Sequence, residues 1–160
     1  QPERRLDLVG QIGARLEVDP PAGMMMTADE VVALRKAGMQ IGAHTVSHPI
    51  LASLEPGEKR REIGESKRVL EALLGERVDL FAYPNGKPGE DFDDDSVQAV
   101  REAGFAVAVT TARGAANRHT DALQIPRFTP WDRTRLRFGL RMLATLWASR
   151  RQAVESGLAV

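Results

Sequence analysis

Two histidines four positions apart carry the most specific chemistry in this sequence. His44 and His48 stand in the segment His-Thr-Val-Ser-His, which Pro49 follows. Imidazole nitrogens are good ligands for zinc, and they also bind cobalt. On a straight strand the two residues would lie roughly 13 Å apart, because each residue advances the chain by about 3.3 Å. The pair can therefore share a metal ion only if the chain folds back between them, and ordinary surface histidines are the alternative.

The rest of the sequence predicts the elements that position these histidines. Apolar segments alternate with segments of helical periodicity, a pattern typical of parallel α/β sheets. Short strands are expected at residues 39–43, 78–83, 105–110 and 123–128. Helices are expected at residues 4–18, 27–38, 56–75, 93–104 and 132 to about 154. Thr27 and Glu30 form a capping-box pattern at the start of the second helix. Because the chemistry of such folds lies at the carboxyl ends of strands, we expect the residues after these strands to share one rim.

Composition excludes several classes of function. The 160 residues are enough for one domain with a hydrophobic core, and 22 basic side chains balance 22 acidic ones. No net charge therefore favours nucleic acid or an anionic membrane as a partner. The sequence holds no cysteine, which excludes disulfides, thiolate metal sites and cysteine nucleophiles. No apolar run approaches membrane-spanning length, so we expect no membrane span and no nucleic-acid partner.

Two segments give the sequence a family resemblance. Residues 41–49, Ile-Gly-Ala-His-Thr-Val-Ser-His-Pro, resemble the second motif of the polysaccharide deacetylases, carbohydrate esterase family 4. Residues 81–86, Phe-Ala-Tyr-Pro-Asn-Gly, are similar to the third motif in one branch of that family. With the order of the helices and strands, the likeness spans about residues 24–131. It implies an α/β fold of the NodB-like type, here an incomplete distorted (β/α) barrel.

The resemblance also implies a reaction and a metal site. The family hydrolyses N-acetyl groups of sugar polymers with the help of a divalent ion. Both histidines of the second motif bind that ion, so His44 and His48 are expected to bind zinc, with cobalt as the alternative. The expected partner is an acetylated polysaccharide or oligosaccharide.

Further site residues follow from the same resemblance. The amide of Asn85 would hold the oxyanion, and Arg127 would orient the carboxylate that acts as base. A plain turn around Asn85 and a surface arginine are the alternatives. Substrate contacts are expected from Tyr83, Pro84 and Trp131, and simple packing is the alternative for the tryptophan.

The sequence departs from the family pattern at two motifs. Nothing matches the first motif, Thr-Phe-Asp-Asp-Gly, whose aspartates serve as base and third metal ligand. We expect that the first barrel strands precede this chain, and a degenerate relative is the alternative. The late histidine that acts as general acid is also absent, since residues 136–147 contain none. His119 is the remaining histidine, in a polar loop.

These observations lead to a set of expectations. The chain should divide into an N-terminal helix and linker (1–23), a deacetylase-like domain (24–131) and an amphipathic C-terminal helix (132–160). The parent protein is expected to be a hydrolase of carbon–nitrogen bonds, and this chain alone to be weak or inactive. A catalytically inactive domain that binds glycan or a protein partner is the alternative, and an O-deacetylase is a third possibility. Open strand edges predict self-association. The start, Gln1-Pro2, has no signal-peptide character, so the cell envelope and the cytoplasm of a bacterium both stay open.

Overall fold

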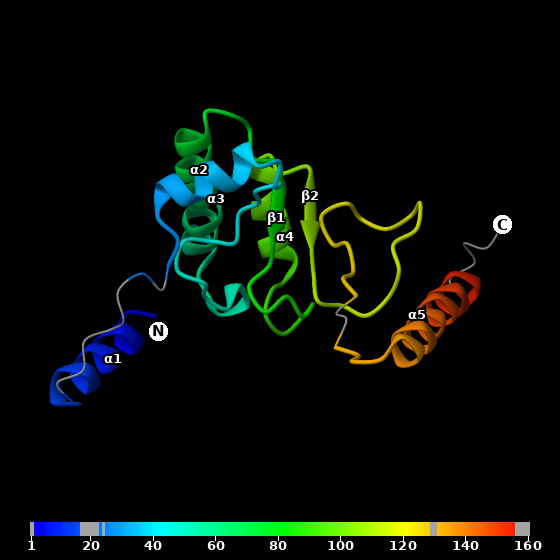
Figure 1. Ribbon diagram of the computed structural model, residues 1–160. Coiled ribbons are helices and arrows are strands. Elements are labelled where there is room, and N and C mark those ends of the chain that lie inside the picture. The colour runs from blue at the N-terminus through cyan, green and yellow to red at the C-terminus, as the bar shows by residue number, and fades with distance from the viewer. Residues whose placement is uncertain (1, 17–22, 24, 129–130, 156–160) are drawn as a thin grey trace.

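The computed structural model describes residues 2–16, 23, 25–128 and 131–155. Its strands are β1 (Leu80–Ala82) and β2 (Val107–Val109). Its helices are α1 (Pro2–Leu16), α2 (Ala28–Lys36), the short 3₁₀ helix η1 (Leu51–Ser53), α3 (Pro56–Leu74), α4 (Asp94–Glu102) and α5 (Arg135–Glu155). Helices α2, α3 and α4 gather around the two strands, whereas α1 and α5 lie apart from them (Figure 1). Within the described residues, no helix is long and apolar enough to cross a membrane.

Four chain segments run parallel at the centre of the fold. β1 and β2 pair in parallel, with Phe81 opposite Ala108. Ala43 forms a parallel bridge to Phe81 on one side, and Ile125 forms one to Val109 on the other. Two of the four predicted strands are therefore present, as β1 and β2, whereas the predicted strands at 39–43 and 123–128 only flank this parallel sheet, each through a single bridge. The carboxyl ends of the four segments meet at one edge.

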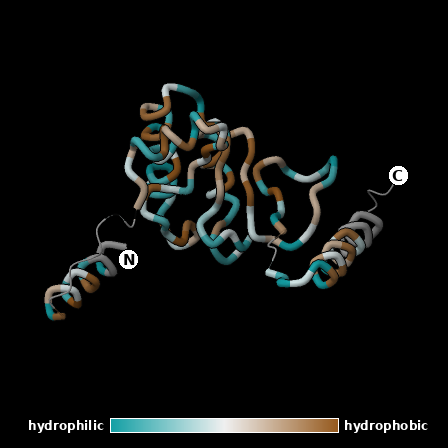
Figure 2. Tube along the Cα trace, in the orientation of Figure 1, coloured by the Kyte–Doolittle hydropathy of each residue, from teal (hydrophilic) through white to brown (hydrophobic). Residues whose placement is uncertain are grey.

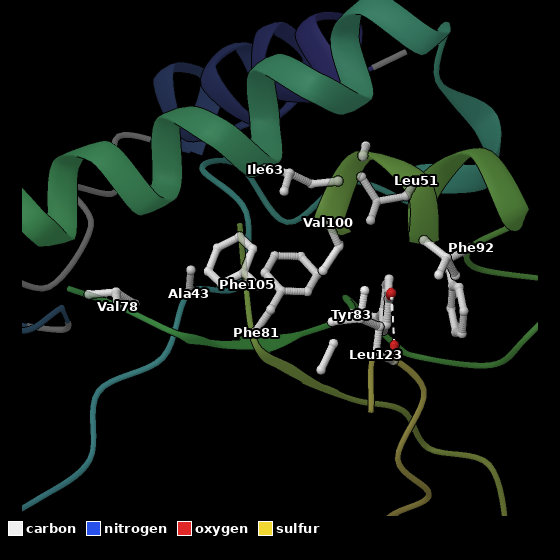
Figure 3. Packing of buried hydrophobic residues seen from close by; sticks show 13 residues of the cluster. Ala43, Leu51, Ile63, Val78, Phe81, Tyr83, Phe92, Val100, Phe105 and Leu123 are labelled. Atoms are coloured by element: carbon white, nitrogen blue, oxygen red, sulfur yellow. Dashed lines mark hydrogen bonds between the residues drawn. The ribbon is translucent and has the colours of Figure 1, made fainter. Parts of the chain in front are cut away.

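The hydrophobic core lies between this sheet and two helices. Phe81 is buried, and the neighbours that alternate with it in β1 are half-buried, so the sheet is covered mainly on one face. In Figure 3, Ile63 from α3 and Val100 from α4 point toward Phe81 and Phe105. Hydrophobic segments run along β1 and β2 through the centre of this unit (Figure 2). Burial of these apolar side chains holds α3 and α4 against the sheet.

The helix boundaries follow the signals in the sequence. Thr27 and Glu30 form the predicted capping box at the start of α2. Pro56 stands at the first turn of α3, and Gly75 ends that helix in the left-handed conformation, with φ 67°. The first predicted helix extends to residue 18, but residues 17–22 lie outside the described residues. The division into three domain segments stays a prediction.

A partly buried ion pair joins α3 to α4. The Lys59 side chain is only 4% exposed, and its Nζ lies 2.6 Å from Oδ2 of Asp93. Asp93 caps α4, where its Oδ1 accepts a hydrogen bond from the Ser96 N–H at 2.9 Å. Burial raises the pKa of Asp93, but the hydrogen bonds from Lys59 and Ser96 outweigh burial and hold the pKa at about 2, below the ordinary 3.8.

The ion pair predicts how stability depends on pH. Because the pKa of Asp93 is lowered on folding, its stabilisation is fully present above pH 3.8 and is lost as the pH falls toward 2. Asp93→Asn should remove this stabilisation while keeping a good helix cap, at a loss of roughly 1 kcal/mol near neutral pH once solvent screening is allowed for. The free energy of unfolding in urea, compared between wild type and variant at several pH values, measures this loss. Asp94→Asn, at the exposed neighbouring position, is the control, and a wild-type advantage that stayed undiminished at pH 2 would contradict the assignment.

A tight turn ties the end of β1 to the end of β2. Gly86 has φ +82°, and the Thr111 N–H donates a 2.8 Å hydrogen bond to the Gly86 carbonyl. A Cβ at Gly86 would lie 3.0 Å from the Thr111 nitrogen, closer than ordinary side chains come. Both the left-handed backbone and the close approach therefore call for glycine here.

A matched pair of variants separates these two requirements. Gly89 also has positive φ, +76°, but a Cβ there would meet nothing within 4 Å. Gly89→Ala should lose about 1 kcal/mol from the left-handed conformation alone. Gly86→Ala should lose roughly 2–4 kcal/mol because crowding against Thr111 adds to that strain. The measurement is the free energy of unfolding in urea, and equal losses in the two variants would show that the contact with Thr111 is unimportant.

Candidate metal centre

His44 is placed by the main chain of the sheet. The Ala43 N–H donates to the Leu80 carbonyl at 2.8 Å, and the Ala82 N–H donates to the Ala43 carbonyl at 2.9 Å. His44 follows directly, and its Nδ1 lies 2.7 Å from the Ala82 carbonyl oxygen. Because a carbonyl only accepts hydrogen bonds, Nδ1 carries the proton, and Nε2 keeps its lone pair for a metal ion.

The chain folds back between the two histidines. The imidazole rings of His44 and His48 lie 4.8 Å apart between centroids, edge to face at 75°. Two residues of this segment have left-handed backbone, Thr45 at φ 65° and His48 at φ 55°. The Thr45 hydroxyl accepts a hydrogen bond from the His48 N–H at 3.1 Å and donates to the His44 carbonyl. The turn that a shared ion requires is therefore present, and both imidazoles are exposed at its surface.

This donor set fits a divalent ion in part. Two imidazoles this close together are suitable ligands for zinc, and a catalytic zinc usually takes three protein ligands. Among the described residues, no third histidine, cysteine, aspartate or glutamate joins them in a cluster. His44 and His48 would thus hold an ion as two of its ligands.

Asn85 stands on the same rim with its amide exposed. The residue has φ 56°, and its carbonyl accepts a hydrogen bond from the Thr111 hydroxyl at 2.8 Å. In the described part of the chain, nothing accepts a hydrogen bond from the Asn85 N–H. A main-chain N–H with no internal partner at the carboxyl edge of a sheet can stabilise negative charge that develops on a ligand.

Tyr83 and Pro84 lie beneath this rim. Both are fully buried, and the Tyr83 ring stacks on Phe92 with centroids 3.9 Å apart. Its hydroxyl donates to the Leu123 carbonyl at 3.0 Å (Figure 3). Burial raises the pKa of Tyr83 well above its ordinary value, so the phenol stays protonated. The structure gives these two residues a packing role under Asn85, and their contact with substrate stays a prediction.

Arg127 and Trp131 both follow the outer segment that contains Ile125. The Arg127 Nε donates to the Thr110 carbonyl at 3.1 Å, just after β2, so its guanidinium reaches the rim. Trp131 is 78% exposed, which leaves its ring available to a ligand. Within the described residues, no hydrogen bond or ring contact joins Asn85, Arg127 or Trp131 to either imidazole. The structure therefore brings the two histidines together, and the roles of Asn85, Arg127 and Trp131 beside them stay predictions.

The sequence analysis missed Glu62, which binds the loop between the histidines. Its side chain lies on α3 and is 6% exposed, and its carboxylate accepts hydrogen bonds from the main-chain N–H groups of Val46 and Ser47, each at 2.9 Å. One signal could have revealed it. The polar residues Lys59, Glu62 and Ser66 share the inward face of α3 with Ile63, where an amphipathic helix normally carries apolar side chains.

Comparisons with known proteins show which proteins this chain resembles. YxkH of Bacillus subtilis strain 168, which is assigned to the polysaccharide deacetylases, is 26% identical over 93 residues, 58% of this chain and 32% of its own length. The deacetylase PplD of Streptococcus pyogenes, solved in complex with acetate, superposes with a TM-score of 0.65 at 24% identity, over 78% of this chain and 52% of its own. IcaB of Ammonifex degensii superposes with a TM-score of 0.57 at 24% identity, over 78% of this chain and 54% of its own.

These relatives define the fold and the family. The solved structures share the deacetylase fold, and this chain spans about a third of the length of YxkH and about half of PplD. The sequence profile of the family described as polysaccharide deacetylase matches residues 12–108, more than half of the chain. The chain therefore belongs to the polysaccharide deacetylase family.

Proposed function

We propose that this chain carries the two-histidine part of the metal centre of an enzyme that hydrolyses N-acetyl groups on a polysaccharide. The observation that supports this most is the pair of exposed imidazoles 4.8 Å apart, with Nδ1 of His44 held by the Ala82 carbonyl. That hydrogen bond leaves Nε2 of His44 as the ligand atom. Family membership supports the reaction class, and zinc is the proposed ion because imidazole suits it, with cobalt as a substitute.

The residues of the rim would each have one task. A bound divalent ion lowers the pKa of a water ligand and polarises the acetyl carbonyl. The Asn85 N–H would donate to the oxyanion that forms when water adds to that carbonyl. Arg127 would hold the base carboxylate through the guanidinium nitrogens that Thr110 leaves free, and the exposed ring of Trp131 would stack on a sugar. Tyr83 would support Asn85 from below.

The proposed substrate follows from the bond that such a metal centre would hydrolyse. An acetylated polysaccharide or oligosaccharide presents the amide carbonyl that such a centre activates, and acetate is the product of its hydrolysis. PplD, which shares the fold, was solved with acetate. We expect this chain alone to release acetate slowly or not at all, because among its described residues no carboxylate joins the histidines.

Metal binding tests the proposal directly. Isothermal titration with Zn²⁺ should give one site per chain, of lower affinity than a complete three-ligand site. His44→Ala combined with His48→Ala should abolish binding, because both ligands are lost. His119→Ala is the control, since that histidine lies in an exposed loop and should leave binding unchanged. A double variant that bound zinc as well as the wild type would refute the two-histidine centre.

The uncovered parts of the sheet predict self-association. The outer segments at Ala43 and Ile125 each pair on one side through a single bridge, and alternate side chains of β1 and β2 are only half-buried. Such edges and faces can pair with a second copy. Light scattering across micromolar concentrations should therefore show dimers or larger species.

A control separates the sheet from α5 as the cause of association. Leu140 and Leu143 on α5 are 58% and 65% exposed, so Leu140→Glu with Leu143→Glu removes apolar surface without touching the sheet. Association should persist in this variant. A monomer in the wild type would contradict the prediction, and a monomer in the variant alone would assign the association to α5.

A further inference from the structure

We propose that Glu62 is a positioning residue that holds the loop from His44 to His48 in the conformation that brings the two imidazoles together. The inference rests on the proposed metal site, because positioning matters only if these histidines are ligands. Glu62 lies 14 positions after His48 in the sequence and reaches the loop from helix α3.

The carboxylate of Glu62 is committed to this loop through both oxygens. Its Oε2 accepts hydrogen bonds from the N–H groups of Val46 and Ser47, both at 2.9 Å. Its Oε1 accepts one from the Ser47 hydroxyl at 3.0 Å. No lysine or arginine among the described residues forms an ion pair with Glu62. The main-chain dipoles of the loop therefore take the place of a counter-ion for a carboxylate that is 6% exposed.

The loop needs such support because its backbone is strained. Thr45 is β-branched and has φ 65°, a conformation that branched side chains rarely adopt, and His48 has φ 55°. Strained residues of this kind persist when the surrounding structure holds them in place. Three successive N–H groups are fixed here: those of Val46 and Ser47 by Glu62, and that of His48 by the Thr45 hydroxyl.

The exposure of Val46 and Ser47 indicates that Glu62 positions the loop and does not merely stabilise the fold. Val46 and Ser47 are exposed, so water can replace the carboxylate as acceptor for their N–H groups when the loop is released. Loss of Glu62 should thus free the loop more than it destabilises the core. Outer-shell partners that hydrogen-bond metal ligands typically contribute about 10–100-fold to metal affinity. Glu62 contacts neither imidazole and would act through the loop that joins the two histidines.

Four variants separate positioning from general stability. Glu62→Ala removes all three hydrogen bonds. Glu62→Gln keeps an oxygen that can accept both main-chain N–H groups but removes the charge, and neutral hydrogen bonds are roughly half as strong as charge-assisted ones. Ser47→Ala removes the side-chain contact alone. Glu58→Ala is the matched control, because Glu58 is exposed on the same helix.

Three measurements read the outcome for every variant. Calorimetry gives the zinc affinity, the visible spectrum of bound Co²⁺ reports the geometry of the ligands, and amide hydrogen exchange at residues 46 and 47 reports the loop without any metal. Glu62→Ala should bind zinc at least about tenfold more weakly, alter the Co²⁺ spectrum and speed exchange at both amides. Glu62→Gln should fall between this variant and the wild type, Ser47→Ala should lose less, and Glu58→Ala should match the wild type.

The outcomes distinguish failure of this inference from failure of the metal site. A folded Glu62→Ala variant with wild-type zinc affinity would overturn the positioning role. If the wild type binds no zinc, the metal proposal fails, and hydrogen exchange at the amides of residues 46 and 47 tests Glu62 by itself. Unchanged exchange rates in Glu62→Ala would then overturn the positioning role, and faster rates confined to the loop would uphold it. If Glu62→Ala does not fold, Glu62→Gln decides in the same way, with wild-type affinity and exchange counting against the inference.

Discussion

Parallel pairing around Phe81 is the constraint on which the candidate centre depends. Main-chain hydrogen bonds with Ala43 set the register of the histidine segment against β1, and this register alone brings the His44 imidazole to the Ala82 carbonyl. A shift by one residue would turn the alternating side chains to the opposite face. The buried Phe81 ring opposes such a shift, because it would have to leave the core beneath α3 and α4. Apolar burial thus fixes the position of a polar, exposed side chain, that of the candidate ligand His44.

The rim of the sheet is also where the backbone departs from its local preferences. Thr45, His48 and Asn85 are the non-glycine residues with positive φ in the described part of the chain, and all three lie just after the carboxyl ends of parallel segments. Each is held by contacts distant in sequence: the loop of the first two by Glu62, and Asn85 by Thr111. Strain gathered at one edge and restrained by long-range hydrogen bonds is what a preorganised site requires.

The sequence predicted those features of the fold and the site that depend on interactions between residues close together in the chain. The histidine spacing, the capping box at Thr27 and the glycine that ends α3 depend on neighbours within a few residues, and the structure has all of them. The four apolar segments were also sufficient to place the rim. Position along the chain did not reveal that Tyr83 faces the core, because its stacking partner Phe92 lies on a separate loop.

The partners of Glu62 were hidden for the same reason. The polar residues beside Ile63 on α3 could have marked Glu62 as buried, but the residues it binds are 15 and 16 positions away. Only the register of α3 against the sheet turns it toward the loop.

The geometry of the two proposed ligands, His44 and His48, and the affinity they would have for a metal ion have separate physical origins. The contacts that orient them all come from residues 43–82: the sheet register, the Ala82 carbonyl, the Thr45 hydroxyl and the Glu62 carboxylate. Orientation is therefore complete within one βα unit and its neighbouring strand. Affinity depends instead on how many ligands converge on the ion, and the described residues offer two candidates, with no cluster of three or more. A half-site that is already oriented loses little further conformational entropy when a remaining ligand is supplied, so most of the binding energy of that ligand would appear as metal affinity.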